Sequence, residues 1–449
     1  MMDQEFLKKA EQKILTCSTI EPELYNDYNV KRGLRNPNGT GVLVGLTKVG
    51  DVHGYLLDEG ETIPAEGRLR YRGVDVADLV SGFQSEGRFG FEESCFLLLF
   101  GYLPNKAELD EFNEVLAISR ILPEGFVSGS ILKFPSNDIM NKLARAILTI
   151  YSFDENPDDL SLVNVIRQCI QLIAQMPLMS AYSYISKLHY MLNGSLYIHR
   201  PRLDYSEAEN FLHILRMDNG FSSIEAETLD LCLVLHAEHG GGNNSTFTTH
   251  VVSSSGTDTY SAIAASIGSL KGPKHGGANI RVKHMMDDLK SHVKNTASDS
   301  EVEDYLVKIL KKQVGDKSGL IYGIGHAVYT KSDPRSILLK EKARTLAVAN
   351  NYEHDLDLYE RVERLAPQVF ADIKGSDKVV SANVDFYSGL VYSMLDIPED
   401  LYTPIFAMAR VAGWSAHRIE ELAFNPRIMR PAYKNVRPPQ EYTPISERG

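Results

Sequence analysis

Apolar side chains recur with helical spacing over most of the chain. Apolar or amphipathic runs that predict helices cover residues 91–100, 105–118, 162–174 and 182–192. Alternation of apolar and polar residues, which is typical of a strand, is confined to residues 41–57, and a second short strand and turn are predicted at 67–73. Because strands do not alternate with helices, the pattern predicts a mainly α fold with a short β region near the N-terminus and excludes a doubly wound sheet.

Two predicted helices in the middle of the chain end beside histidines. Residues 229–235 are apolar except for one aspartate, which predicts a buried helix, and His236 and His239 are expected to share a face near its end. A second helix, predicted over 260–270, is rich in small residues and ends at a Gly-Pro pair that places His275 on a turn. Burying polar imidazoles costs free energy unless they find partners. The three histidines are therefore candidate functional residues.

The second half of the chain carries more charged amphipathic helices. They are predicted over residues 280–291, 301–312 and 334–350. Asp333 followed by Pro334 is typical of a helix start, because Asp caps the free amides and Pro suits the first helical position. The last long helix is predicted over 403–424, and it places Arg410 among apolar neighbours. The change of character indicates a second, smaller domain.

Length, charge and cysteine spacing restrict the class of protein. At 449 residues the chain is too long for one ordinary core, so two domains are expected. A formal net charge of −12 argues against binding to nucleic acid or to an anionic membrane, so an anionic substrate needs a local cluster of Arg or Lys. The four cysteines show no CxxC spacing, which favours reduced thiols in a cytoplasmic protein. We expect no signal or transit peptide and no membrane-spanning run.

Several polar residues stand out against the helical background, and each has an ordinary structural explanation. His326 follows Gly323 and Gly325, but this Gly-x-Gly lacks the third glycine of a dinucleotide-binding turn. Asp385 could cap the helix that follows it, and Arg410 could be a salt-bridged or snorkelling residue. The glycine turns beside the histidines nevertheless favour a bound ligand, since glycine lets the backbone approach it closely.

A metal site is another explanation for the histidines. The ligand set could consist of His236, His239, His275, His326 and Asp385. Neither a His-Glu-x-x-His motif nor a cysteine pair is present, which argues against the common zinc motifs. From the residues alone, both explanations stay open.

The order and spacing of these motifs resemble the citrate synthases. The resemblance rests on Leu-His-Ala-Glu-His at 235–239, Gly-Pro-x-His-Gly-Gly-Ala-Asn at 272–279, Gly-His-x-Val-Tyr-x-x-x-Asp-Pro-Arg at 325–335 and Asn-Val-Asp-Phe-Tyr-Ser-Gly at 383–389, and it extends from 69–73 through 98–104 to Arg430-Pro431. It implies a nearly all-α fold, an active site in the cleft between two domains, and a homodimer in which Arg430 reaches the partner's site. The implied division is an N-terminal extension with a short β region at 1–66, a large helical domain at 67–277 and 387–449, and a small helical domain at 278–386.

The resemblance also implies a role for each site residue, and it makes His275, His326 and Asp385 catalytic. Asp385 would remove a proton from the methyl group of acetyl-CoA while His275, whose pKa a helix start would lower, donates a hydrogen bond to the thioester oxygen. His326 and His239 would bind and polarise the ketone of oxaloacetate, and His326 would donate towards the new alkoxide. The implied carboxylate clamp consists of Arg335, Arg410 and Arg430, because guanidinium forks suit planar carboxylates.

Coenzyme A contacts are implied by the same resemblance. They fall on Gly323, Gly325, Lys331, Lys378 and Asn383. Many relatives carry a basic residue where this chain has Thr330, so Lys331 is expected to take over the contact with the CoA phosphate. Neither a metal nor a redox cofactor is implied, because acetyl-CoA and oxaloacetate are both substrates.

Three alternatives to citrate synthesis stay open at this point. 2-Methylcitrate synthases use propionyl-CoA through the same residues, and one methylene is worth only ~1–3 kcal/mol in an apolar pocket. A metal-dependent hydrolase could be built on the histidines. A non-catalytic relative would be expected to lack one of the three catalytic groups, and this chain has all three.

Overall fold

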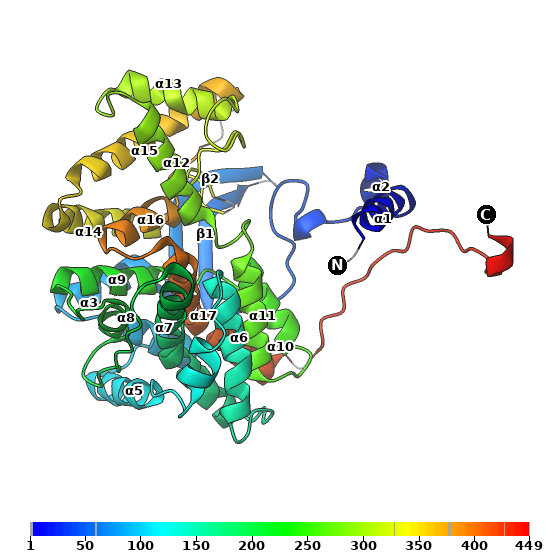
Figure 1. The fold of residues 1–449 in the computed structure, drawn as a ribbon. Coiled ribbons are helices and arrows are strands. Elements are labelled where there is room, and N and C mark those ends of the chain that lie inside the picture. The colour runs from blue at the N-terminus through cyan, green and yellow to red at the C-terminus, as the bar shows by residue number, and fades with distance from the viewer. Residues whose placement is uncertain (1–2, 59–60, 327, 376–378, 426, 449) are drawn as a thin grey trace. The chain divides into compact units, whose positions relative to one another are not determined.

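The structure of the protein is a computed structural model that describes residues 3–58, 61–326, 328–375, 379–425 and 427–448 (Figure 1). The chain divides into two compact units, which are described separately. One unit consists of Met1–Val44 with Met429–Gly449, and the other is Gly45–Ile428. The second unit contains the predicted site residues except Arg430.

The terminal unit holds short helices. They are α1 Gln4–Cys17, α2 Pro22–Asp27 and the 3₁₀ turns η1 Arg32–Leu34 and η5 Ile445–Glu447. Helix α1 begins where the Asp3 carboxylate accepts from the backbone N–H of Glu5 at 2.9 Å, and none of its residues is buried. A helix without a buried face gains little from packing, so these elements add little to the hydrophobic core.

The prediction of a strand over residues 41–57 is wrong in its first half. The side chains of Val44 and Leu46 are 52% and 91% exposed, and residues 42–46 form no strand. A strand needs partners for its backbone groups along its whole length, but Gly41 forms only an isolated bridge with Arg35 and the sheet begins at Gly50. The alternation at Val44 and Leu46 therefore does not mark the face of a sheet.

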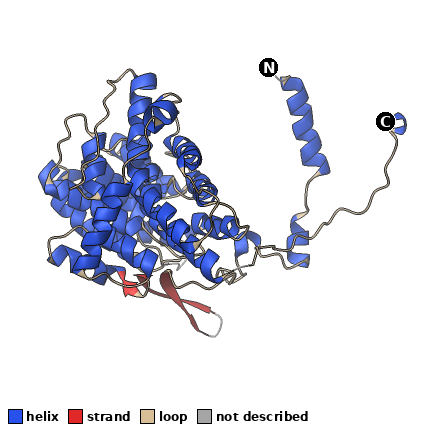
Figure 2. Cartoon of the chain, turned by 90° about the horizontal axis from the view of Figure 1, so that it is seen from below, coloured by secondary structure: helices blue, strands red, loops and turns tan. Residues whose placement is uncertain are grey.

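The sheet is small and antiparallel, with the order β1-β2-β3. Its strands are β1 Gly50–Asp58, β2 Glu61–Tyr71 and β3 Val74–Asp75, drawn in red in Figure 2. Gly50 pairs with Tyr71 at one end, and the register shifts between His53 and Tyr55. Arg72 and Gly73 have positive φ values of 51° and 90°, so the predicted turn after the second strand is confirmed.

Helices make up the rest of the regular secondary structure in the described chain, which confirms the mainly α fold. The helices and helical turns of this unit are α3 Val76–Ser85, α4 Phe91–Phe100, α5 Lys106–Ser119, η2 Val127–Leu132, α6 Ile139–Ile150, η3 Tyr151–Phe153, α7 Leu162–Leu192, α8 Glu207–Leu215, α9 Ser223–His236, α10 Asn244–Ser253, α11 Thr259–Lys271, α12 Ala278–His292, α13 Asp299–Leu310, α14 Pro334–Asn350, α15 Glu353–Lys374, α16 Val384–Met394, η4 Glu399–Leu401 and α17 Tyr402–Phe424. None of the helices in the described part of the chain has the length and apolarity needed to span a membrane.

The predicted helix bounds hold best where a cap or a breaker marks the end. Helix α14 begins at Pro334 with Asp333 as its cap, as predicted. The helices predicted at 162–174 and 182–192 are instead one continuous helix that passes through Pro177. Proline removes one backbone hydrogen bond, but nearly all of the central part of α7 is buried, and that packing keeps the helix continuous. Helix α15 has no counterpart among the predicted elements.

Helix α17 lies at the centre of the core. It packs against α7, α10, α4, α9 and α11, and its Trp414 is fully buried. Helices α12 and α14 both pack on α16, while α13 packs on α15. Helix α14 also contacts α9, so the start of α14 and the end of α9 lie near each other. The division into a large and a small domain stays a prediction.

Candidate active site

His239 lies in a loop, not on the helix that precedes it. Helix α9 ends at His236, with Ala237 as its C-cap, so the prediction that His236 and His239 share a helical face is wrong. The His239 ring is buried and meets the rings of His326 and Tyr329 edge-on, with centroid distances of 5.2 and 5.5 Å. Its Nε2 has no hydrogen-bond partner in the described part of the chain. The ring is therefore available to a ligand.

The backbone fixes the tautomer of His326. The N–H groups of Val328 and Tyr329 donate to its Nδ1 at 3.0 and 3.1 Å. A ring nitrogen that accepts hydrogen bonds carries no proton, so the proton of the neutral imidazole is on Nε2. His326 is thus oriented as an Nε2–H donor. Burial, followed by the charge of Arg335, holds the pKa of the neighbouring His239 well below its usual value, so His239 is neutral.

Arg335 is held by an aspartate at the start of α14. The Asp333 carboxylate accepts from Arg335 Nε at 3.0 Å and from Nη2 at 2.7 Å, and it also accepts from the backbone N–H of Arg335. The same carboxylate accepts from the N–H of Val384 at 3.2 Å. Asp333 therefore caps one helix, orients the guanidinium and ties α14 to the start of α16.

Arg410 is a fully buried cation with unused donors. Its Nε donates to the carbonyl oxygen of His236 at 2.6 Å, but Nη1 and Nη2 find no acceptor among the described residues. Burial is the main cause that lowers the pKa of Arg410 to about 10, and the charge of Arg335 lowers it further, against the opposing effect of Glu238. Two free, parallel N–H donors on a buried guanidinium match a carboxylate ligand.

Asp385 is not the cap of its helix. Asn383 fills that place by accepting from the backbone N–H of Asp385 at 3.0 Å, so the alternative in which Asp385 caps the helix is wrong. Burial raises the pKa of Asp385 to about 6, although the charge of Arg335 opposes the shift. The carboxylate is therefore ionised at neutral pH and a stronger base than an exposed aspartate.

His275 lies on the predicted turn between α11 and α12. Its Nε2 accepts from the backbone N–H of Ser245 at 3.3 Å, so its proton is on Nδ1. The Ser245 hydroxyl lies 3.0 Å from the same Nε2 and accepts from Trp414 Nε1 at 3.2 Å. Burial lowers the pKa of His275 to about 4, followed by the charge of Arg410. The predicted lowering of the His275 pKa is thus present, and burial is its main cause.

The predicted residues lie within electrostatic reach of one another. The charge of Arg410 lowers the pKa values of His239 and His275, and it opposes the burial that raises the pKa of Asp385. His326 joins the group through its ring contact with His239. Side chains that are more than a hundred positions apart in sequence therefore surround one region that holds two guanidinium groups, neutral imidazoles and one carboxylate.

The residues predicted for coenzyme A are placed less completely. Gly325 donates its N–H to the carbonyl oxygen of Ser381 at 2.7 Å, and its own carbonyl accepts from Asn383 Nδ2 at 2.8 Å. Gly323 has a φ of 79°, and a Cβ there would lie 2.7 Å from the Phe386 ring, so only glycine fits. Asn383 therefore has a structural role as a cap and a bridge.

The remaining predicted contacts lie outside this region or outside the described residues. Lys331 is exposed on the segment between His326 and α14. Lys378 lies outside the described residues. Arg430 is exposed in the terminal unit, and its place in a partner's site stays a prediction.

Several residues of the site were not predicted from the sequence. Ser245 orients His275 from thirty positions away, and no sequence signal indicates that contact. Asp333 was predicted only as a helix cap, although an acid two residues before a candidate guanidinium could have suggested their pairing. The Glu238 carboxylate accepts from His417 Nε2 at 3.0 Å, and both side chains are fully buried. These residues position the groups that face a ligand.

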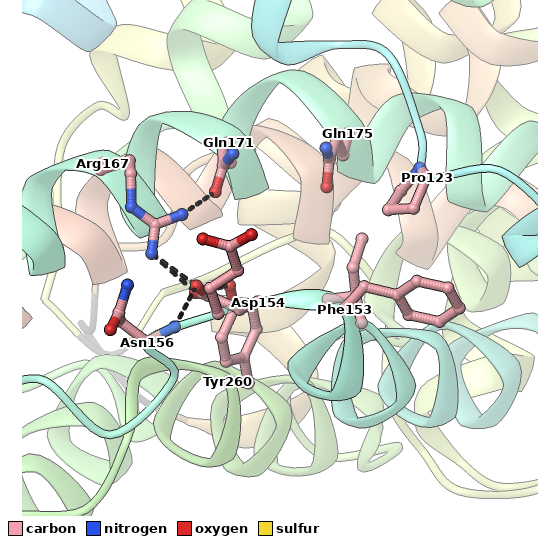
Figure 3. Close-up of a pocket in the computed structure, with 10 residues that line it drawn as sticks. Pro123, Phe153, Asp154, Asn156, Arg167, Gln171, Gln175 and Tyr260 are labelled. Atoms are coloured by element: carbon pink, nitrogen blue, oxygen red, sulfur yellow. Dashed lines mark hydrogen bonds and ion pairs between the residues drawn. The ribbon is translucent and has the colours of Figure 1, made fainter.

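A separate cavity of about 420 Å³ contains none of the predicted site residues (Figure 3). Asp154 accepts there from Arg167 at 2.7 Å and from the Tyr260 hydroxyl at 2.6 Å. Arg167 also donates to Gln171 at 2.7 Å, and Gln175 donates to the carbonyl oxygen of Ser119 at 3.0 Å. These polar groups pair with one another. The cavity is therefore lined by a structural hydrogen-bond network that joins α7, α11 and the loop before α7.

Among residues 3–58, 61–326, 328–375, 379–425 and 427–448, no three His, Cys, Asp or Glu side chains converge to hold a metal ion. The geometry of the site therefore gives the metal-dependent hydrolase no support.

Comparison with known proteins agrees with the geometry. Residues 38–432 match the family described as "Citrate synthase, C-terminal domain". "Citrate synthase 2" of Bacillus subtilis is 37% identical over 388 residues, which cover 85% of this chain and 93% of that protein. "2-methylcitrate synthase 1" of Corynebacterium glutamicum is 33% identical over 430 residues, which cover 94% of this chain and 100% of that protein. The citrate synthase of Thermoplasma acidophilum, solved with carboxymethyl coenzyme A and oxaloacetate, has a TM-score of 0.75 and 26% identity over 93% of this chain and 99% of its own.

Proposed function

The chain belongs to the citrate synthase family, and we propose that it condenses acetyl-CoA with oxaloacetate and hydrolyses citryl-CoA to citrate and coenzyme A. One observation carries the proposal: the buried guanidinium of Arg410 keeps two donors free beside Arg335, two neutral histidines and a basic carboxylate. A small dicarboxylate that also carries a ketone matches the guanidinium groups and the histidines, and the basic carboxylate remains to take a proton from the second substrate. Oxaloacetate is such a molecule.

Oxaloacetate is proposed to bind through both ends. Arg410 offers Nη1 and Nη2 to one carboxylate, and Arg335 lies close enough for its charge to lower the pKa of Arg410. His326 presents Nε2–H towards the ketone, since its Nδ1 is occupied by backbone donors. Neutral His239 lies beside it, ring to ring. A hydrogen bond to the ketone oxygen makes its carbon more electrophilic and stabilises the alkoxide that forms.

Asp385 and His275 are proposed to generate the nucleophile. Asp385 accepts a proton from the methyl carbon of acetyl-CoA, and the electron pair of that C–H bond becomes the C=C bond of the thioester enolate. His275 stabilises the enolate oxyanion with its Nδ1–H, because Ser245 occupies Nε2. Each such group typically contributes ~10²–10⁴-fold to the rate. The enolate carbon then attacks the ketone, and the new alkoxide takes the proton that His326 offers.

Water completes the reaction by hydrolysing the thioester of citryl-CoA. We propose that the site closes around the substrates, so that water is excluded until the carbon–carbon bond has formed. The proposal includes a homodimer in which Arg430 of each chain adds a third guanidinium to the partner's site. It also includes a cytoplasmic location, which the free thiols of Cys17, Cys95, Cys169 and Cys232 support.

Propionyl-CoA is the main competitor for acetyl-CoA. Relatives of both kinds are similar to this chain, and the 2-methylcitrate synthase of Corynebacterium glutamicum is 33% identical over nearly its whole length. One methylene changes binding by only ~1–3 kcal/mol in an apolar pocket. Comparison of kcat/KM for the two thioesters, at saturating oxaloacetate, decides between citrate and 2-methylcitrate as the product.

The test of the proposal is an assay of free CoA thiol. Purified protein is mixed with acetyl-CoA, and thiol release is followed with and without oxaloacetate. The proposal expects release only when both substrates are present, and citrate as the product by mass spectrometry. Release that is independent of oxaloacetate would instead make the protein a simple thioesterase, and no release with either acyl-CoA would remove the proposed activity.

A further inference from the structure

The β1–β2 hairpin packs on the loop that carries two of the candidate site residues. This site loop runs from His326 to Asp333, contains no helix or strand among its described residues, and leads directly into α14 with Arg335 in its first turn. An irregular segment has few internal hydrogen bonds, so its conformation depends on what packs against it. Here the packing partner is the hairpin, 265 or more positions earlier in the sequence.

Two glycines of the hairpin allow this approach. A Cβ on Gly54 would lie 2.6 Å from the Cα of Tyr329, and it would also collide with the carbonyl oxygen of Val328. A Cβ on Gly67 would lie 2.8 Å from the ring of Tyr329 and would collide with the carbonyl oxygen of Ser332. Real Cβ atoms do not come this close to other heavy atoms, so the two backbones touch only because both strand positions lack a side chain.

Hydroxyl groups of the site loop complete the pairing with the hairpin. The Thr330 hydroxyl accepts from the N–H of Ala65 at 3.1 Å and faces the carbonyl oxygens of both Ala65 and Gly54. The Ser332 hydroxyl accepts from the N–H of Gly67 at 3.1 Å and donates to the Glu66 carboxylate. Thr330 thus satisfies backbone groups of both strands, where the register between His53 and Tyr55 is interrupted.

The same hairpin also contacts the loop that carries His239. A Cβ on Gly50 would lie 2.9 Å from Cγ of Glu238, the residue before His239, and a Cβ on Gly240 would lie 3.2 Å from Val52. The Tyr71 hydroxyl donates to the carbonyl oxygen of Val234 at 2.8 Å. One small sheet therefore touches both segments from which the paired histidines project.

We propose that the β1–β2 hairpin is a positioning element of the oxaloacetate site, and that Thr330 is the residue through which it fixes the site loop. The proposal rests on the proposed function. The Thr330 hydroxyl contacts backbone groups of the hairpin, so Thr330 acts as a positioning residue. It sets the distance between His239 and His326 by holding the loop of His326 to the hairpin. The N-terminal strands, which contain none of the site residues predicted from the sequence, thereby become part of the binding architecture.

The test compares Thr330→Val with Thr330→Ser. Valine keeps the shape but removes the hydroxyl, which leaves the N–H of Ala65 and two carbonyl groups without their partner, whereas serine keeps the hydroxyl. We expect about tenfold weaker oxaloacetate binding for Thr330→Val, measured by calorimetry and as KM, and near wild-type binding for Thr330→Ser. Thr149→Val is the matched control, because it removes a hydroxyl that donates to a backbone carbonyl at 2.7 Å on α6.

The outcomes separate this proposal from the proposed function. Thiol release by the wild-type protein tests the proposed function. If the wild-type protein releases no thiol, the role of the hairpin can still be tested, because calorimetry measures the binding of oxaloacetate without turnover. The proposal is overturned if Thr330→Val binds oxaloacetate within twofold of wild type. It is also overturned if Thr149→Val lowers the unfolding temperature and weakens oxaloacetate binding as much as Thr330→Val does. If Thr330→Val does not fold, Ser332→Ala removes the neighbouring anchor and is expected to weaken oxaloacetate binding about threefold.

Discussion

Replacement of Arg410 by Leu separates the requirements of folding from those of substrate binding. Arg410 is 0% exposed, and with the described residues it makes one hydrogen bond, from Nε to the carbonyl oxygen of His236. Burial lowers the pKa of Arg410 to about 10, which corresponds to ~3 kcal/mol against the charged form. The unpaired Nη1 and Nη2 are the physical origin of this free-energy cost. A leucine side chain has no polar groups and would not incur it. The lost bond is worth ~1.5–3 kcal/mol, so Arg410→Leu should leave the free energy of unfolding unchanged or slightly higher.

The effect on binding should have the opposite sign and be large. In the complex, the guanidinium fork is proposed to pair with a substrate carboxylate away from water. Truncating one partner of such a buried pair costs ~2–5 kcal/mol. Oxaloacetate should therefore bind roughly 30- to several thousand-fold more weakly to Arg410→Leu.

Arg418 provides the matched control on the same helix. It is also 0% exposed, but its donors are used: Nε donates to Thr259 at 3.1 Å, Nη1 to Ser253 at 3.0 Å and Nη2 to the carbonyl oxygen of Thr257 at 2.8 Å. Arg418→Leu leaves three acceptors without this partner, so the free energy of unfolding should fall by at least ~3 kcal/mol. Its folded fraction should still bind oxaloacetate normally.

Denaturant unfolding and calorimetric titration with oxaloacetate measure both quantities on the same samples. Thiol-release kinetics at varied oxaloacetate provide KM as a second measure of binding. The reasoning is refuted if Arg410→Leu binds oxaloacetate within threefold of wild type. It is also refuted if Arg410→Leu loses as much stability as Arg418→Leu, because Arg410 would then be a structural residue.

Three further predictions concern the chemistry. Asp385→Asn should lower turnover by ~10²–10⁴-fold. The kcat of the wild type should fall as the pH drops through about 6, because burial raises the pKa of Asp385 to that value. A kcat that stays constant from pH 5 to 8 would contradict this role. Because the pKa of Asp385 is raised in the folded state, its ionised carboxylate destabilises the fold above pH 6, and this effect disappears towards pH 4. Asp385→Asn should therefore raise the Tm at pH 8 but not at pH 4. His275→Ala should lower turnover by a similar factor while oxaloacetate affinity stays unchanged, which kinetics and calorimetry measure together. Exhaustive chelation should leave thiol release unchanged, and lost activity that added metal restores would revive the hydrolase alternative.

Local signals in the sequence determined most of the helical fold. Caps and breakers act over a few residues, so the start of α14 at Asp333-Pro334 and the extent of α17 could be predicted. The predictions failed where a distant partner decides the structure. Alternation at 42–46 forms no strand because this stretch does not join the β1-β2-β3 sheet of the described chain, and Pro177 does not break α7 because tertiary packing outweighs one lost hydrogen bond.

Motif order, through the resemblance to a family, also predicted which residues form a site, and the charge of Arg410 reaches three of them. It could not show how each is oriented, because the orienting partners are remote in sequence. Ser245 sets the tautomer of His275, and Asn383 takes over the capping role that Asp385 could have had. These contacts exist only after the helices have packed.

The sequence by itself therefore determined a mainly helical chain and a set of acids, imidazoles and guanidinium groups. The helix predicted over 403–424 contains both Arg410 and Arg418, and only the resemblance to a family singled out Arg410 as part of a carboxylate clamp. The tertiary structure supplies the physical reason, because the described residues offer acceptors to every nitrogen group of Arg418 but to just one of Arg410. Burial without enough acceptors is a property of the assembled core, and it marks the arginine that is left to bind a substrate.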